Sequence, residues 1–297
     1  MPRSRHPRRL TLTAAAKVNL ALEILGKRPD GYHELATVFQ AVDLADRLVL
    51  EDADELTMTT TSGELPIDGS NLALRAAAAL REAAKVDRGV RLHLDKRIPV
   101  AAGLGGGSTD AAAVLLGLDR LWNLRWPRRR LAEIARTLGM DVPYFLAGGA
   151  AVGRGRGEEV TKAAGIPLAL VLVNPGRPLD TAAVYGRVTP AMYSGGDMTE
   201  RMVDALRTRR TTKVASSLYN GLEAAAAAMC PELQRMKAAL HAAGALGTLM
   251  SGSGPTVFGV ARSFEQARQI RARLSRASWS CWAVRSVSGP AVRMRAA

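Results

Sequence analysis

IPVAAGLGGGSTDAAAVLL, residues 98–116, is the most informative stretch of this chain. It places four glycines within five positions, at Gly103, Gly105, Gly106 and Gly107, directly before an apolar segment. Glycines allow left-handed backbone and close approach of a ligand to the main chain. Successive N–H groups in such a loop form an anion-binding concavity, and a helix N-terminus adds its own N–H groups and dipole. The stretch therefore predicts a phosphate-binding loop that leads into a buried helix.

Two common phosphate-binding fingerprints do not fit this stretch. Its glycines do not have the GxGxxG spacing of a dinucleotide-binding turn, and no GK[ST] follows as in a Walker A loop. The alternative without a ligand is a flexible glycine hinge before a core helix, although a turn needs fewer glycines. We expect Ser108 to cap the helix or to contact phosphate or Mg²⁺, and these roles stay open. Asp110 is expected to be structural, favourable to the dipole of the first helical turn.

Composition indicates a globular protein outside the membrane. With 297 residues, of which 47% are hydrophobic, the chain can build one large or two medium domains. No apolar run approaches the roughly 18–20 residues that cross a bilayer, and the N-terminus MPRSRHPRRL lacks the apolar segment of a signal peptide. Cys230 and Cys281 have no partners at metal spacing. One disulfide would be compatible with the sequence, but a reducing cytoplasm is the simpler expectation.

The net charge of +14 raises the question of nucleic-acid binding. Part of the excess lies at the two ends and in one inter-helix cluster: Arg3, Arg5, Arg8, Arg9, Arg125, Arg128, Arg129, Arg130, Arg293 and Arg295. Aromatic residues make up only 4%, so few rings are available for stacking on bases. This pattern favours a solvated surface, or a field that attracts anionic small molecules, and we expect no nucleic-acid partner.

The predicted elements give an α+β chain with a boundary near residues 163–167. In the first part we expect strands at 10–14, 20–24, 38–42, 48–50, 56–61 and 90–94, helices at 71–84, after the glycine loop and at 128–138, and a hairpin at 150–160. The second part opens with a buried strand at 168–173 and interleaves helices with at least three strands, the last at 279–287. The two domains are expected at 1–165 and 166–297.

Three blocks in fixed order resemble the motifs of the GHMP small-molecule kinases, which include galacto-, homoserine, mevalonate and phosphomevalonate kinases. The blocks are AAAKVNLAL at 14–22, PVAAGLGGGSTDAA at 99–112 and MSGSGPTVFG at 250–259. The resemblance implies an N-terminal domain like ribosomal protein S5 domain 2, a ferredoxin-like C-terminal domain and a site between them.

Two further blocks resemble one branch of that family. They are RPDGYHEL at 28–35 and GMDVPYFLAGGAAVGRGRGE at 139–158. This branch uses ATP to phosphorylate the 2-hydroxyl of 4-diphosphocytidyl-2-C-methyl-D-erythritol, in the non-mevalonate route to isoprenoid precursors. The resemblance therefore implies a cytidine diphosphate-linked substrate, with ATP and Mg²⁺ as cofactors.

The resemblance also implies the catalytic pair. Asp141 matches the aspartate that takes the proton of the substrate hydroxyl, and its alternative role is the N-cap of the segment that Pro143 opens. Lys17 matches the catalytic lysine, which could lower the pKa of Asp141, orient the hydroxyl or stabilise transferring charge. The alternative for Lys17 is a solvated lysine at a strand end. Asn19, two residues on, shares a strand face with Lys17 and resembles a substrate-binding position.

The remaining site residues follow the same resemblance, and no protein metal ligand is among them. The ATP loop comprises Pro99, Val100, Ala101, Ala102, Gly103, Leu104, Gly105, Gly106, Gly107, Ser108 and Thr109, with Asn71, Leu72 and Lys96 near adenine. Tyr32 and Tyr185 are expected to lie on either side of the cytosine ring, with His33 at its edge. Asp180 and Thr181 would border the erythritol end. Residues 252–254 are expected either to close over the substrate or to form a plain turn.

Two alternatives remain at this stage. The protein could be another GHMP kinase, such as a homoserine or mevalonate kinase, but the substrates of those enzymes contain no base that could stack on Tyr32 and Tyr185. A non-catalytic nucleic-acid-binding protein on an S5-like fold would account for the charge, but it leaves Lys17, Asp141 and the glycine loop unexplained. Oligomeric state is not predicted.

Overall fold

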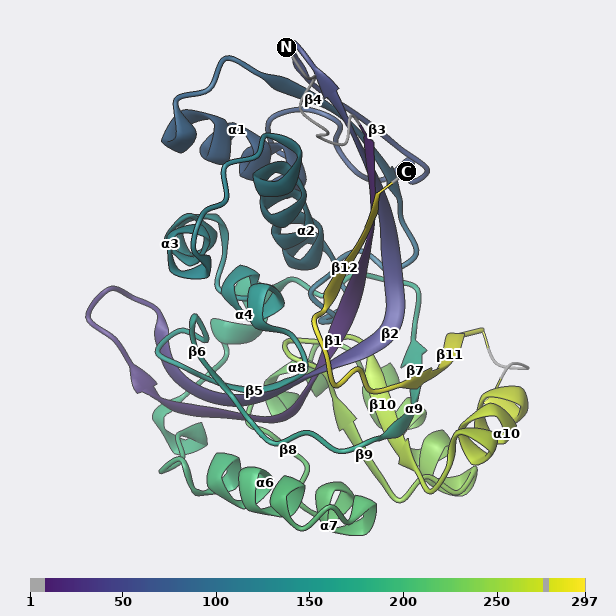
Figure 1. Cartoon of the computed structure of the whole chain (residues 1–297). Helices are drawn as coiled ribbons and strands as arrows, with labels where there is room; N and C mark the ends of the chain where they lie inside the picture. Colours follow the sequence, from purple (N-terminus) through teal and green to yellow (C-terminus); the bar gives the residue numbers. More distant parts are fainter. Residues whose placement is uncertain (1–8, 275–277, 297) are drawn as a thin grey trace.

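The computed structural model describes residues 9–274 and 278–296, which form two β-sheets with helices packed on them (Figure 1). The part of the basic N-terminus that holds Arg3, Arg5 and Arg8 lies outside the described residues. None of the described helices is long and apolar enough to cross a membrane.

Two long antiparallel strands, β1 (Arg9–Lys27) and β2 (His33–Ala53), form the spine of the first sheet. The expectation of two short strands in place of β1 was wrong, because AAAKVNLAL lies inside one continuous strand. The backbone of this central part is buried on both faces, so its sequence lacks the alternation that marks a half-buried strand. Register shifts interrupt the β1–β2 pairing at three places, one of them between Asn19 and Ala21.

The first sheet has the order β12-β1-β2-β4-β3, with β5 and β6 continuing from β2 and β8 on β1. Its other strands are β3 (Leu56–Thr60), β4 (Gly89–Asp95), β5 (Ala150–Arg154), β6 (Glu159–Lys162), β8 (Tyr219–Asn220) and β12 (Val292–Ala296). Figure 1 shows its helices on one side of β1 and β2: α1 (Leu72–Ala84), α2 (Gly106–Leu121), α3 (Arg128–Leu138) and α4 (Val142–Ala147). Apolar side chains of these helices and strands form one core beneath the glycine loop.

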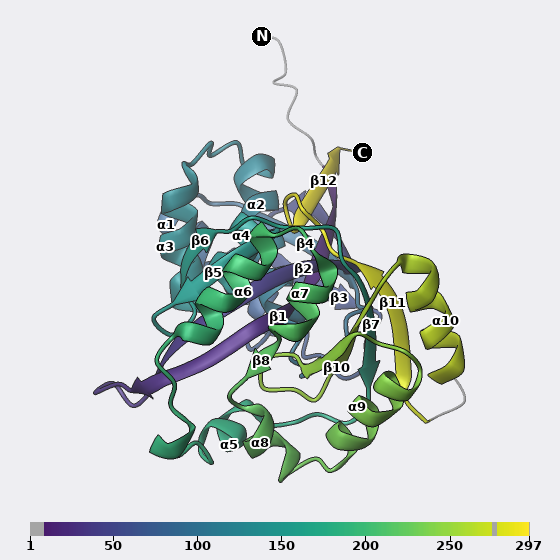
Figure 2. The same ribbon diagram turned by 90° about the horizontal axis from the view of Figure 1, so that it is seen from below.

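The second sheet has the antiparallel order β11-β7-β10-β9. Its strands are β7 (Ala169–Asn174), β9 (Gly247–Met250), β10 (Val257–Ala261) and β11 (Ser280–Arg285). Helices lie between β7 and β9: α5 (Thr181–Tyr185), α6 (Asp197–Arg207), α7 (Thr211–Ser216), α8 (Glu223–Ala227) and α9 (Glu232–Ala242), with a 3₁₀ turn η1 (Pro190–Met192). The helix α10 (Phe264–Leu274) joins β10 to β11. This strand–helix–strand–strand–helix–strand order is ferredoxin-like, and Figure 2 shows α9 and α10 beside this sheet.

Two strands, the two-residue β8 and β12, were not expected from the sequence. The expectation of separate strands at 38–42 and 48–50 was also wrong, because both lie within the single strand β2. The last strand was placed at 279–287, but β12 follows it and pairs antiparallel with β1. Arg293 and Arg295 alternate along β12 with Val292 and Met294, and the basic residues led to its interpretation as a charged tail. Because β8 and β12 both join the first sheet from the second half of the chain, the boundary near residue 165 stays a prediction.

Candidate active site

A cavity of about 1050 Å³ lies where the first sheet, the glycine loop, α4 and α5 meet. Its volume exceeds the roughly 300–1,000 Å³ of a typical pocket for one small ligand, so it has room for a nucleotide and a second substrate. The site residues predicted from the sequence line it except Leu104, Thr109, Asp180 and Gly254. Asp180 instead caps α5, with its Oδ1 accepting the Ala183 N–H at 2.6 Å. Leu104 and Thr109 are buried beside the cavity, and the Leu104 carbonyl accepts the backbone N–H of Lys17 at 3.0 Å.

Lys17 and Asp141 meet inside this cavity. The Lys17 ammonium lies 3.3 Å from Asp141 Oδ2, and its side chain is only 5% exposed, against 30% for Asp141. Lys17 is therefore not a solvated strand-end residue. Asp141 stands at the N-cap position of α4, but its side chain makes no capping hydrogen bond. The geometry thus directs the carboxylate toward Lys17 and the cavity.

Asn19 holds Lys17 through a chain of hydrogen bonds with a fixed direction. The Lys17 ammonium, which can only donate, bonds Asn19 Oδ1 at 2.7 Å. Asn19 Nδ2 donates to Thr37 Oγ1 at 2.8 Å, and the Thr37 hydroxyl donates to the Ala21 carbonyl at 2.7 Å. The register shift next to Asn19 re-aims the strand at this point. Thr37 carries no sequence signal, because its contact crosses from β2 to β1.

The glycine loop opens the N-terminus of α2 toward the cavity. The helix begins at Gly106, with Gly105 at the N-cap in a left-handed conformation (φ 71°) and no side-chain cap. Ser108 is therefore not the cap, because the glycine turn brings the chain into helical geometry before it. The Thr109 N–H makes the first bond back, to Gly105, so the N–H groups of residues 106–108 have no intrahelical partner. This is the geometry of an anion site.

The loop 251–254 supports the glycine loop from behind. Ser251 Oγ donates to the Gly103 carbonyl at 2.9 Å. A Cβ on Gly103 would lie 2.2 Å from the Ser251 carbonyl oxygen, so only glycine permits this approach. Gly252 and Ser253 also line the cavity, and the hydroxyls of Ser253 and Thr181 are hydrogen-bonded at 2.8 Å. The segment therefore packs against the glycine loop, and its residues Gly252 and Ser253 line the cavity.

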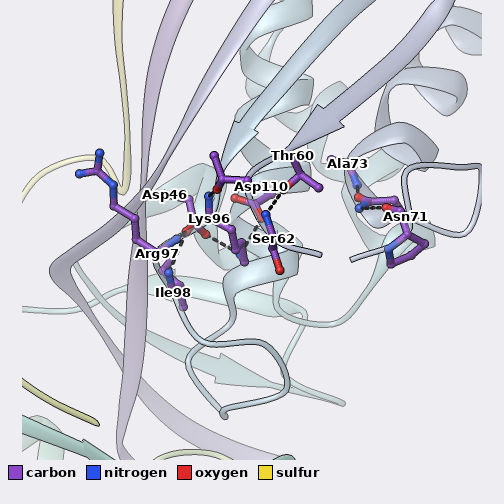
Figure 3. Close-up of polar contacts among 11 residues, drawn as sticks. Asp46, Thr60, Ser62, Asn71, Ala73, Lys96, Arg97, Ile98 and Asp110 are labelled. Atoms are coloured by element: carbon purple, nitrogen blue, oxygen red, sulfur yellow. Dashed lines mark hydrogen bonds and ion pairs between the residues drawn. The ribbon is translucent and has the colours of Figure 1, made fainter. Parts of the chain in front are cut away.

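Residues expected near adenine are occupied by contacts within the protein (Figure 3). Asn71 caps α1: its Oδ1 accepts the Ala73 N–H at 2.9 Å, and its Nδ2 donates to the Pro66 carbonyl. The Lys96 ammonium lies 2.5 Å from Asp46 Oδ2 and 2.8 Å from Asp110 Oδ2. Leu72 lines the same region of the cavity.

The expectation that Asp110 acts on the helix dipole in the first turn was wrong. Because α2 begins at Gly106, Asp110 is past the first turn, and it faces inward. Its side chain is 4% exposed and binds Lys96 instead of acting on the helix dipole. Asp46, the second partner of Lys96, was missed, because it lies on a different strand and only the fold brings the two together.

Aromatic side chains gather at the other end of the cavity. The rings of His33 and Tyr185 stack with centroids 5.4 Å apart, and Tyr193 meets His33 edge-on. Tyr32 is 53% exposed, with the Arg156 guanidinium 5.0 Å from its ring centre. Burial and the charge of Lys27 lower the pKa of His33, so its ring is neutral at pH 7. Arg156 was not singled out from the sequence, although it stands in the GRGRGE turn between β5 and β6.

Comparison with known proteins identifies the family of the chain. The model of the GHMP kinases N terminal domain matches residues 71–149, and that of the GHMP kinases C terminal domain matches residues 202–281. The chain is 45% identical over 270 residues to 4-diphosphocytidyl-2-C-methyl-D-erythritol kinase of Pelotomaculum thermopropionicum, covering 90% of this chain and 94% of that protein. The chain belongs to the GHMP kinases. The enzyme of the same name from Moorella thermoacetica is 46% identical, with 89% and 94% covered.

Solved structures confirm the GHMP kinase fold expected from the sequence. A crystal structure of 4-(cytidine 5'-diphospho)-2C-methyl-D-erythritol kinase superposes with a TM-score of 0.82 at 40% identity, covering 94% of this chain and all of that one. The homoserine kinase of Cytophaga hutchinsonii has a TM-score of 0.77 at 20% identity, covering 99% of this chain and 100% of that one. At that identity it shows the shared fold alone.

Proposed function

We propose that this GHMP kinase transfers the γ-phosphate of ATP to the 2-hydroxyl of 4-diphosphocytidyl-2-C-methyl-D-erythritol. The observation that carries the proposal is the Lys17–Asp141 pair, which lies in one cavity with the open N-terminus of α2 and the aromatic cluster. The relatives named above support the choice of substrate.

Asp141 acts as the base in this proposal. Its carboxylate is partly exposed in the cavity and makes no helix cap, so it is free to accept the hydroxyl proton as the phosphoryl group arrives. Lys17, fixed by Asn19, lies beside the Asp141 carboxylate and offers positive charge to the transferring group. The N–H groups at the start of α2 bind the ATP phosphates.

Mg²⁺ is expected to arrive with ATP. No group of three or more histidine, cysteine or acidic side chains in the described part of the chain is arranged to hold a metal ion by itself. That suits Mg²⁺, which usually binds one or two protein oxygens together with phosphates and water. Ser108, which lines the cavity, would hold it through its hydroxyl. When bound, it neutralises charge on the transferring phosphates.

The aromatic cluster is proposed to recognise cytosine. Tyr32, Tyr185 and His33 offer flat faces on which a base can stack. A neutral His33 has one donor and one acceptor nitrogen, which suits the edge of cytosine. The placement of cytosine between the two tyrosines stays a prediction.

A coupled assay of ADP release tests the proposal. We expect ADP to form with the cytidylylated methylerythritol and not with homoserine or mevalonate. Lys17→Ala serves as the inactive control, so that background ATP hydrolysis is measured. Turnover of homoserine or mevalonate without the cytidylylated substrate would contradict the proposed substrate while leaving the kinase chemistry in place.

A further inference from the structure

Three buried charged side chains form a cluster directly beneath the glycine loop (Figure 3). Asp46 comes from β2, Lys96 from the segment after β4, and Asp110 from α2. Their side chains are 0%, 5% and 4% exposed, and the Lys96 ammonium bridges the two carboxylates. The mechanism proposed above assigns no role to Asp46 or Asp110.

Asp46 holds the segment that leads into the loop. Its Oδ1 accepts the backbone N–H groups of Arg97 at 2.6 Å and Ile98 at 2.8 Å, while Oδ2 takes the Lys96 ammonium. Three successive residues before Pro99 are thereby fixed to one carboxylate. Because hydrogen bonds to a charged acceptor are stronger than neutral ones, this stem is firmly placed.

Lys96 extends the connection to the other side of the loop. Its ammonium reaches Asp110 in α2 and lies so near the helix start that a Cβ on Gly106 would be 2.8 Å from it. The two stems of the loop, residues 96–98 and α2, are therefore tied to one ammonium group. Two of the three donors of this ammonium are therefore directed to acidic side chains of the protein.

Burial of such a cluster is a poor way to gain stability, because each ion loses its hydration. Two acidic side chains also share a single ammonium. The arrangement does, however, fix residues 96–98 relative to the start of α2. The glycine loop and its N–H groups lie between these two segments. If the loop already has its binding shape before a ligand arrives, less conformational entropy is lost on binding.

We propose that Asp46 is a positioning residue for the nucleotide: through Lys96 and the backbone of residues 97–98 it holds the glycine loop in its phosphate-binding shape. The inference rests on the proposed function in taking ATP as the nucleotide. It concerns binding and not phosphoryl transfer, so binding can be measured where turnover is absent.

Titration calorimetry with the β,γ-imido analogue of ATP and Mg²⁺ tests the proposal, with cytidine diphosphate as the probe of the acceptor end. The variant Asp46→Asn keeps the size of the side chain but presents an N–H₂ group to Lys96. We expect its Kd for the ATP analogue to rise about tenfold, as loss of a charge-assisted hydrogen bond predicts. The Kd for cytidine diphosphate should change by less than about twofold, because the aromatic cluster lies away from this stem.

Asp95→Asn is the matched control. Asp95 precedes Lys96 and pairs with the exposed Arg97 side chain, outside the buried cluster. Its variant removes the same charge beside the same stem, and both Kd values should stay at wild-type level. In Asp110→Asn the Kd for the ATP analogue should rise by less than in Asp46→Asn, because Lys96 still pairs with Asp46. The Kd for cytidine diphosphate should not change.

Circular dichroism and urea unfolding establish whether each variant folds. If Asp46→Asn does not fold, the comparison of Asp110→Asn with Asp95→Asn carries the test. Equal Kd values for the ATP analogue in wild type and in the folded cluster variant, or an equal loss for both ligands, would overturn the positioning role. If no ADP formed with the cytidylylated substrate, the proposed function would be contradicted, but the Kd values for the ATP analogue would still test the positioning role.

Discussion

The ammonium nitrogen of Lys17 lies 3.3 Å from Oδ2 of Asp141. This contact joins the middle of β1 to the first residue of the turn into α4, so the first sheet and the helical layer meet at the proposed reaction centre. Lys17 is the better buried of the two, which leaves Asp141 as the group that a substrate hydroxyl can reach. In the proposed mechanism the two side chains therefore have different roles.

Replacing Asp141 by asparagine tests the proposed base. The amide keeps the size of the carboxylate but cannot accept a proton in the same way, so kcat should fall by about 10²-fold or more. The Kd of the ATP analogue should stay close to wild type. Steady-state kinetics and calorimetry together measure this, and near-normal turnover would remove Asp141 from the role.

The variant Lys17→Ala removes a preorganised positive charge. Loss of one such donor typically lowers kcat by about 10²–10³-fold, and we expect at least that. Circular dichroism should show a folded protein, because Lys17 is not part of the hydrophobic cores beside β1 and its replacement leaves them intact. If the variant fails to fold, Lys17 has a mainly structural role.

Thr37 should affect the reaction through Asn19. In Thr37→Val the buried amide of Asn19 loses its acceptor, so Asn19 no longer has a fixed orientation toward Lys17. Loss of about 1 kcal/mol of hydrogen bonding predicts a fall in kcat of roughly fivefold with little change in either KM. Thr37→Ser keeps the hydroxyl and should restore kcat. A lower melting temperature with unchanged kcat would instead indicate a structural role alone.

The aromatic cluster should govern the acceptor KM. Base–aromatic stacking contributes roughly 1–3 kcal/mol, so Tyr185→Ala should raise KM for the cytidylylated substrate by about five-fold to a few hundred-fold. His33→Ala should also weaken the preference for cytosine over uracil, because that choice depends on edge hydrogen bonds. KM for ATP should hardly change in either variant, and the opposite pattern would reverse the assignment of the two ends of the cavity.

Stability should depend on pH through Asp110. Burial raises the pKa of Asp110 to about 8, against the lowering effect of the Lys96 charge, from a usual value of 3.8. The folded protein thus holds a proton that the unfolded chain releases, and this contribution to stability is present below about pH 4 and lost as the pH rises to about 8. In urea unfolding, the free energy of unfolding should decrease less over this pH range in Asp110→Asn than in wild type. Asp95→Asn should decline in parallel with wild type, and identical slopes in all three would contradict the assignment.

Locally encoded features were well predicted from the sequence. The helix expected at 128–138 is α3 with the same bounds, and the helix expected at 71–84 is α1, which Asn71 caps. The glycine loop leads into α2, and a hairpin forms at 150–160. Capping, helical periodicity and turn chemistry act within a few residues, so the sequence carries them directly. Family resemblance supplied the catalytic pair, whose roles stay predictions.

Features that arise from distant pairing could not be predicted. Asp46, Thr37 and Arg156 gain their surroundings only when strands and turns far apart in sequence meet. Of the roles left open for Ser108, the helix cap is excluded because Gly105 begins the helix without a side-chain cap. The strand interpretation of β1 failed because a segment buried on both faces has no alternation to detect.

The pairing of β12 with β1 has a consequence for biosynthesis. Leu10 through Ala14 face Ala296 through Val292, and the Ala15 N–H bonds the Ala291 carbonyl at 3.0 Å. This strand leaves the ribosome after every other described element, so until then the edge of β1 that precedes Lys17 has no neighbour on that side. A nascent or truncated chain would carry an open edge there, which is a template for pairing with other chains. The last described strand thus protects the strand that bears the proposed catalytic lysine.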